Sequence, residues 1–487
     1  MTAVLEAPIT TQVEAPAAAP ARYRWRWLAY SAVLAATVMD LLDSTVVGVA
    51  APAIQADLGG TYASLQWMGA GYTMALAVLL LIGGRLGDMF GRKRMLLVGI
   101  AGFVVTSLVC AVAQTPETLI LFRVLQGAFS AVMIPQGFGL IRDLFPPSEM
   151  AKAWGVFGPI MGLSAMLGPI IGGGLVDLAG WRSIFLINLP VGAFAFIIAA
   201  KFLPKASPTA TSKRLDVGGV LLAAAGTFML IYPLVQGREL GWPAWTVGML
   251  LAAVAVLAGF GVHQVRRKRA GKTQLIETSV FARRSYVSGV LFAVVFFAAM
   301  GGMFIVGVFL QLGLGYSPME ASLTMAPWAF GAMVGSGFGG ALMQKLGRKI
   351  LHIGLALMGI GVATMYLVYT SAGIGIDGWD MIIPNLVGGV GMGMIFVPLF
   401  DIVLGDVSDS EVGSASGALG SFEQLGISLG VAVIGTVFFS LVGHGGGHLE
   451  SALDGAEKAS LVTFGLIVVG FLVGFLLPKK ARAQSGH

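Results

Sequence analysis

The chain has 487 residues, of which 56% are hydrophobic and only 11% are charged, and its formal net charge is +6. A soluble domain carries roughly 25% charged residues because its surface must face water, so this composition excludes a disordered chain, a secreted disulfide scaffold and a soluble enzyme. The apolar residues are numerous enough for about fourteen spans of ~20 residues each. The sequence therefore predicts an all-α polytopic membrane protein.

The predicted elements start after a tail, residues 1–27, which we expect to be disordered and cytoplasmic. Transmembrane helices are expected near residues 28–50, 63–82, 95–113, 118–140, 151–178, 184–202, 216–236, 244–265, 286–312, 319–343, 350–371, 381–405, 413–441 and 459–477. They group into an N-terminal six-helix bundle (28–202), a linker with two further helices and a basic cytoplasmic loop (203–285), a C-terminal six-helix bundle (286–477) and a cytoplasmic tail (478–487).

The basic residues indicate the orientation of these spans. Of the 30 lysines and arginines, all but four lie in the tails and loops on the side of the N-terminus. Because cytoplasmic loops carry the excess of Lys and Arg, both termini are expected in the cytoplasm. The chain itself is expected in the cytoplasmic (inner) membrane. The positive net charge is then a topology signal, and no nucleic-acid partner is expected.

An internal repeat relates the two bundles. The segment Gly84–Lys93 (GRLGDMFGRK) follows the second span, and a degraded copy, Gly340–Lys349 (GALMQKLGRK), follows the tenth span. Two six-helix halves therefore repeat in parallel, with two helices inserted between them. Paired repeats of this kind are typical of transporters that rock around a site near the middle of the membrane.

Several motifs resemble one known family. Gly84–Lys93 resembles the signature loop of the major facilitator superfamily, and fourteen spans with an inserted pair resemble its drug:proton antiporter branch. Further matches to that branch are Leu42–Val47 before Ala51-Pro52 (with Gly48 where Asn is usual), Trp181–Pro190, Leu215–Gly219, and Gln311 with Gly315–Pro318. The resemblance implies two six-helix bundles plus two central helices. It also implies a proton-coupled antiporter that exports hydrophobic or cationic organic compounds, such as drugs and antibiotics, by alternating access.

The signature loop is expected to act as a conformational latch between the two halves. The resemblance assigns this role to Gly84, Asp88, Gly91 and Arg92. Asp88 can accept hydrogen bonds from basic groups or from a helix N-terminus. The alternative is that the basic residues of the loop only set the topology. The second copy has Gln344 in place of the aspartate, so its latch is expected to be weaker or absent.

Charged residues inside the spans are the strongest candidates for function, because each costs roughly 2.5–3.5 kcal/mol at the middle of a bilayer. Asp40 and Asp43 share one face of the first helix. Asp43 is expected about 10 Å from the outer end of that helix, and Arg123 about 8 Å along the fourth helix. Asp43 and Arg123 therefore share a depth in the membrane and are plausible partners.

Arg123 and Gln126 match the helix-4 motif that the family uses for proton coupling. The resemblance implies that a carboxylate of the first helix binds a proton when the cation moves away and releases it when the cation returns. The sequence does not choose between Asp40 and Asp43. The alternative is a static salt bridge that joins helices 1 and 4.

Other residues are candidates for the transport path. Glu423, expected near the middle of helix 13, is either a second proton site or a contact for a cationic substrate, or else only a structural hydrogen-bond partner. We also expect the substrate cavity to be lined by Gln126, Met133, Gln311 and Trp328. Gly158, Gly162, Gly168, Pro169 and Gly172 resemble the antiporter motif of exporters, with ordinary helix packing as the alternative.

The sequence contains no nucleophile–base set, so we expect no enzyme activity. Gly271-Lys272-Thr273 lacks the glycine that a phosphate-binding loop needs five residues earlier, so neither ATP nor another cofactor is expected. His444 and His448 are expected in a flexible loop rather than at a metal. The predicted partners are a small organic substrate, protons and lipid, and the chain is expected to be monomeric. Two alternatives stay open: a proton-coupled importer, and a membrane sensor or scaffold that transports nothing.

Overall fold

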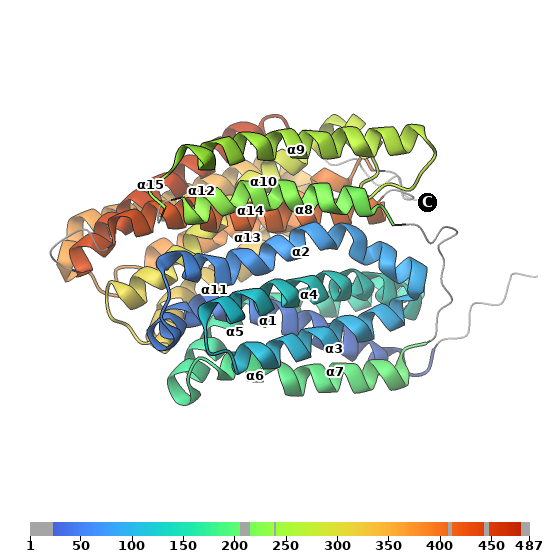
Figure 1. Ribbon diagram of the computed structural model, residues 1–487, viewed down its shortest axis with the longest axis horizontal. Coiled ribbons are helices and arrows are strands. Elements are labelled where there is room, and N and C mark those ends of the chain that lie inside the picture. The colour runs from blue at the N-terminus through green and yellow to red at the C-terminus, as the bar shows by residue number, and fades with distance from the viewer. Residues whose placement is uncertain (1–22, 205–214, 238–239, 408–411, 443–447, 479–487) are drawn as a thin grey trace, which may run out of the picture.

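The structure, a computed structural model, describes residues 23–204, 215–237, 240–407, 412–442 and 448–478, and a few side chains within these ranges are left undescribed. Most of the predicted tails and His444 lie outside the described residues. The described chain consists of helices and their connections, and the long helices run roughly side by side (Figure 1).

The first part of the chain forms seven helices and the inserted part forms two. They are α1 (Arg26–Leu58), α2 (Tyr62–Phe90), α3 (Arg92–Ala111), α4 (Pro116–Leu144), α5 (Pro147–Ala179), the four-residue α6 (Ser183–Leu186), α7 (Asn188–Phe202), α8 (Val217–Gln236) and α9 (Ala244–Arg269). The last part forms α10 (Arg284–Leu312), α11 (Pro318–Leu346), α12 (Lys349–Ala372), α13 (Ile382–Leu404), α14 (Val412–Leu441) and α15 (His448–Gly474), with short 3₁₀ turns at Val280–Ala282 and Gly373–Gly375.

Each expected span corresponds to one long helix, except that 184–202 is formed by α6 and α7 together, and this confirms the predicted fold class. Among the described residues, twelve helical segments are long and apolar enough to cross a membrane; the other two long helices are α5, whose described apolar stretch is Leu167–Ala179, and α11. Both of these contain many glycines, and they pack against each other. Close packing of small residues lets neighbouring helices approach each other within a bundle.

Two predicted boundaries were wrong. The first helix continues through Pro52 to Leu58 instead of ending near residue 50, and Ile54 near its end is fully buried. The last helix begins at His448 rather than near 459, because Ala452 and Leu453 already pack against Phe438 at the end of α14. In both cases tertiary packing extends a helix beyond its most apolar stretch.

The internal repeat is visible in matching details of the two bundles. Gly91 ends α2 with φ 92° and Gly347 ends α11 with φ 51°, the left-handed backbone region that favours glycine. The hydroxyl of Tyr30 on α1 donates to the carbonyl of Ala153 on α5 at 2.8 Å. Tyr286 on α10 donates to Ala415 on α14 at the same distance. The repeat therefore relates α1 to α10, α2 to α11 and α5 to α14.

Two seams join the bundles, and the repeat exchanges them. In one seam α2 packs along α14, and in the other α5 packs along α11. The inserted helix α8 packs on α2 and α14, with α9 outside it, so the insertion lies against one seam only (Figure 1).

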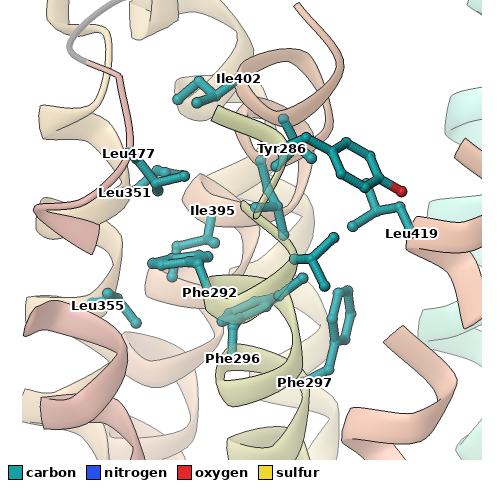
Figure 2. Packing of buried hydrophobic residues seen from close by; sticks show 14 of the residues in the cluster. Tyr286, Phe292, Phe296, Phe297, Leu351, Leu355, Ile395, Ile402, Leu419 and Leu477 are labelled. Carbon is teal, nitrogen blue, oxygen red and sulfur yellow. The ribbon is translucent and has the colours of Figure 1, made fainter. Parts of the chain in front are cut away.

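Each bundle has its own apolar core. In the C-terminal bundle, Phe292, Phe296 and Phe297 of α10 pack against Leu351 and Leu355 of α12, with Ile395, Ile402, Leu419 and Leu477 around them (Figure 2). The equivalent core of the N-terminal bundle surrounds Tyr30, Met39 and Phe103. Separate cores allow the two bundles to move as units against each other.

Candidate functional site

A buried ion pair lies inside the N-terminal bundle. The side chains of Asp43 on α1 and Arg123 on α4 are each 1% exposed, and Nη1 of Arg123 pairs with Oδ2 of Asp43. The structure thus brings together two of the residues that the sequence analysis singled out. Because α1 extends to Leu58, Asp43 lies near the middle of its helix rather than close to the end.

Two neutral amides complete the surroundings of the Asp43 carboxylate. Oδ1 of Asp43 accepts hydrogen bonds from Nε2 of Gln126 at 3.0 Å and from Nδ2 of Asn188 at 2.7 Å. Nη1 of Arg123 also donates to Oε1 of Gln126 at 2.7 Å. Asn188 is anchored in turn on Oγ of Ser107, at 2.9 Å. Both oxygens of Asp43 therefore have partners, as a buried carboxylate requires.

Asp40 lies in a separate setting three residues earlier on α1. Its Oδ1 accepts from the hydroxyl of Tyr72 on α2 and from Oγ of Ser130 on α4. Both donors are neutral, and Asp40 forms no salt bridge with the described residues. It is 9% exposed, compared with 1% for Asp43.

Tyr72 connects the two settings. The guanidinium carbon of Arg123 lies 4.3 Å from the centroid of the Tyr72 ring, a cation–π contact, while the hydroxyl of the same ring donates to Asp40. Asp43, Arg123, Tyr72 and Asp40 thus form one continuous polar network across α1, α2 and α4.

Local structure explains how these side chains meet. Arg123, Gln126 and Ser130 are spaced three and four residues apart, so they share one face of α4. Asn188 begins α7, just after the break that separates it from α6. Pro190 has no N–H to offer the Leu186 carbonyl, which accounts for that break and lets Asn188 turn towards α1.

Sequence reasoning missed Tyr72, Ser130 and Asn188 as members of the network. Asn188 carries a usable signal, since an amide at the start of an apolar span needs a partner and Asn188 lies within the Trp181–Pro190 motif. Tyr72 and Ser130 carried none, because a tyrosine or serine is common inside spans.

Arg92 of the signature loop contacts an acid on α4. Arg92 donates to Oδ1 of Asp143 at 3.0 Å and to the Gly139 carbonyl at 3.2 Å, so the loop is tied to α4. The side chain of Asp88 lies outside the described residues. Gly91 lies at the turn between α2 and α3, and Gly84 lies earlier on α2.

Glu423 on α14 has no hydrogen-bond or ion-pair partner among the described residues and is partly exposed. On a helix with about 100° per residue, Gly420 and Ser428 face α2, and Gly426 faces α10. Glu423 falls between these two directions and opposite Leu425, which packs towards α8. Its position on α14 therefore lies between the sides that face α2 and α10.

The other expected substrate contacts are placed differently. Gln126 is fully buried in the Asp43 network, and Met133 is 1% exposed and packs against Gly99 of α3, so neither lines a cavity in this conformation. Trp328 lines an apolar cavity inside the C-terminal bundle, together with Asn385 and Thr463. These positions follow from the faces of α4 and α11 that pack inward, which the sequence spacing alone did not define.

Gln311 belongs to a seal at the end of the molecule away from the chain termini, here called the far end. Its Nε2 donates to the carbonyl of Val49 on α1 at 2.8 Å. Nearby, the backbone N–H of Met319 donates to Oδ2 of Asp177 at 3.1 Å, and Tyr62 stacks on Phe439 with ring centroids 4.8 Å apart. The two bundles are therefore closed against each other at the far end.

The glycines of α5 permit close approach to two neighbouring helices. A Cβ at Gly168 would lie 2.3 Å from Oγ1 of Thr45, and one at Gly172 would lie 1.8 Å from Cγ1 of Val46, both on α1. A Cβ at Gly173 would instead lie 2.6 Å from the Pro318 carbonyl of α11. Pro169 lies between these glycines in the same helix. Gly158 and Gly162 lie outside the residues whose surroundings are described.

Comparison with known proteins agrees with this architecture. The family profile of the Major Facilitator Superfamily matches residues 33–431. The chain is 48% identical to a probable actinorhodin transporter of Streptomyces coelicolor, over 91% of this chain and 77% of that protein. It is 36% identical to the tetracenomycin C resistance and export protein of Streptomyces glaucescens, over 86% and 77% of the two chains.

Solved structures of other transporters share the fold of this chain. A bacterial homologue of the human lysosomal transporter Spinster, in an inward-facing and unoccupied conformation, superposes with a TM-score of 0.64 over 95% of this chain and 99% of that one, at 17% identity. The match to a family of transporters agrees with the expectation that the chain is not an enzyme. Its fold, its repeat and its sequence together place this multi-pass membrane protein in the Major Facilitator Superfamily.

Proposed function

We propose that the protein is a proton-driven antiporter that exports hydrophobic or cationic organic compounds, including antibiotics, from the cell. The observation that carries this proposal is the buried network of Asp43, Arg123 and Asp40, with a third carboxylate, Glu423, on α14 between the sides that face α2 and α10. Titratable groups buried in a spanning bundle are costly and mark ion paths. The names of two relatives, a probable actinorhodin transporter and a tetracenomycin C resistance and export protein, support export of antibiotics.

The same proposal fixes the orientation and the energy source. The excess of Lys and Arg on the side of the termini supports cytoplasmic termini in the cytoplasmic membrane. In that orientation the closed far end faces outward, so the structure corresponds to an inward-facing state. Protons moving inward drive export, with no cofactor and no ATP, and a monomer contains all the groups required.

Inside-out membrane vesicles give a direct test, with ethidium as the fluorescent cationic probe. With an acidified lumen, vesicles that contain the protein are expected to accumulate ethidium, and nigericin, which collapses the pH gradient, is expected to stop the accumulation. Vesicles with the double variant Asp40→Asn/Asp43→Asn serve as the matched control and should not accumulate the probe.

Three outcomes contradict the proposal. Gradient-driven loss of ethidium from the lumen would indicate an importer. Accumulation that requires ATP rather than the pH gradient would exclude proton drive. Absence of any flux with ethidium and a panel of lipophilic and aromatic compounds would favour a sensor or scaffold.

A further inference from the structure

The two aspartates of α1 differ in the charge of their partners. Asp43 is sealed, with Arg123 on one oxygen and two amides on the other. Asp40 has only neutral hydroxyl donors, and both of them bond to the same oxygen, Oδ1. Its other oxygen, Oδ2, forms no hydrogen bond with the described residues.

This difference decides which carboxyl can take up a proton at low cost. Protonation of Asp43 would leave the Arg123 guanidinium as an unpaired charge in a site that is 1% exposed, and such a charge is strongly destabilising. Protonation of Asp40 on Oδ2 would leave both of its hydrogen bonds on Oδ1 in place. It would also remove a negative charge that no cation contacts.

The groups around Asp40 also couple it to the ion pair of Asp43 and Arg123. The charges that act on it are those of Asp43, on its own helix, and Arg123, on α4. From α2 and α4 the groups in direct contact are the hydroxyls of Tyr72 and Ser130. Because the Arg123 guanidinium also lies on the Tyr72 ring at 4.3 Å, a displacement of Arg123 alters the position of the hydroxyl that donates to Asp40.

We propose that Asp40 is the carboxyl that binds and releases the transported proton, that Asp43 stays ionised as the counterion of Arg123, and that Tyr72 is the positioning residue between them. This division of roles rests on the proposed proton-driven transport. In each cycle Oδ2 of Asp40 gains a proton from one side of the membrane and loses it to the other, and no other bond is made or broken.

The test compares two transport modes in liposomes that contain the purified protein. Equilibrium exchange of ethidium requires the conformational change but no net proton movement, whereas uphill ethidium transport requires both. Asp40→Asn is expected to retain exchange within about twofold of wild type and to lose uphill transport. Asp43→Asn is expected to lose both modes, because it leaves Arg123 buried without its counterion.

Tyr72→Phe examines the positioning role. This variant keeps the ring under Arg123 but removes one donor from the ionised Asp40 carboxylate, so Asp40 holds its proton more tightly. The pH of half-maximal uphill transport is expected to rise by about one unit, the tenfold change that one hydrogen bond to a charged group supplies. Ser130→Ala, which removes the other donor, should shift it in the same direction.

Tyr30→Phe is the matched control. Tyr30 is also a buried phenol at the α1 interface, but it bonds the Ala153 carbonyl rather than a carboxylate. Its loss should leave the pH of half-maximal transport unchanged.

The outcomes separate this proposal from the proposed function. Uphill transport by Asp40→Asn, or retained exchange with lost uphill transport in Asp43→Asn, overturns the division of roles while proton coupling stands. An unshifted pH profile in Tyr72→Phe overturns the positioning role. A wild-type protein that exchanges ethidium but never moves it uphill in a pH gradient contradicts the proposed function itself.

Discussion

At the residue scale, the molecule contains two kinds of ion pair, buried and exposed, which differ in how much stability is lost when one partner is removed. The pair of Asp43 and Arg123 is excluded from solvent, whereas Arg182 and Asp57, joined at 2.6 Å, are 36% and 46% exposed. A buried pair is weak evidence for stability as a whole, but removal of one partner leaves an uncompensated charge. An exposed pair is screened by water and contributes little.

Substitution of Arg123 should therefore destabilise the protein far more than substitution of Arg182. We expect Arg123→Met to lower the free energy of unfolding by about 3–5 kcal/mol. Arg182→Met should lower it by about 1 kcal/mol or less. The double variant Asp43→Asn/Arg123→Met should recover most of the loss, since no buried charge remains. Thermal unfolding in detergent measures all three, and equal losses for Arg123→Met and the double variant would contradict the argument.

Glu423 should set the preference for cationic compounds. Since its carboxylate has no partner among the described residues, Glu423→Gln is expected to raise the KM for ethidium about tenfold while leaving that for a neutral compound within about twofold. Gln424→Glu on the same helix is a useful comparison, because residue 424 points towards α2. Equal effects on cationic and neutral compounds would contradict a charge-based role.

At the scale of elements, helix α5 shows how consecutive glycines permit close contacts with different neighbouring helices. Gly172 lies against Val46 of α1 and Gly173 against α11 of the other bundle, whereas a Cβ on Gly174 would meet only Sδ of Met319 at 3.9 Å. The first contact is internal to one bundle, and the second contributes to the seal at the far end. Alternating access requires the second contact to open while the first stays intact.

Alanine at each of these glycines should therefore give a different result. Gly172→Ala is expected to destabilise the protein by about 1–3 kcal/mol through overpacking. Gly173→Ala is expected to weaken the far-end seal and to increase the labelling rate of a cysteine introduced there, in a Cys110→Ala background. Gly174→Ala is the control for both measurements. Equal labelling in Gly173→Ala and Gly174→Ala would show that this contact does not hold the seal.

Sequence patterns predicted the helices and the repeat because both depend on local hydropathy and glycine placement, as at Gly91 and Gly347. They predicted the partnership of Asp43 and Arg123 because charges inside a span need partners. They could not distinguish Asp40 from Asp43, since the difference lies in Tyr72 and Asn188, which come from other helices. Nor could they place Met133, whose direction depends on how α3 and α4 are rotated against each other.

At the scale of the whole molecule, Asp216 links the inserted helices to the rest of the protein. It is the N-cap of α8 and accepts from the Gly219 N–H at 2.9 Å, from Nε2 of His263 at 2.8 Å and from Nε2 of Gln264 at 2.8 Å. Gln264 also accepts from the N–H of Leu275, whose side chain packs near the ends of α2 and α14. This carboxylate thus secures α8, α9 and the loop that follows them.

The contribution of Asp216 should depend on pH in a defined direction. Burial raises the pKa of Asp216, but the hydrogen bonds from His263, Gly219 and Gln264 and the charge of Arg267 outweigh it and hold the pKa below its usual 3.8. A group with a depressed folded-state pKa stabilises the protein above its unfolded pKa, and this contribution is lost as the pH falls through the folded pKa.

The melting temperature of Asp216→Asn should accordingly lie below that of wild type from pH 7 down to about pH 4, and the gap should close at lower pH. Glu117→Gln, at an exposed position on α4, is the control and should show little gap at any pH. A gap that stays constant to the lowest pH would indicate that the carboxylate charge is not what stabilises this corner.

The one-sided position of α8 also bears on how a lipid-soluble compound reaches the interior. Trp67 of α2 lies against Phe228 and Tyr232 of α8, with ring centroids 6.3 and 6.1 Å apart, so aromatic side chains line the contact between α8 and α2 beside the α2–α14 seam. No described helix covers the α5–α11 seam in the same way. A molecule dissolved in the bilayer thus meets two layers of helices on the α2–α14 flank and one glycine-containing layer on the α5–α11 flank.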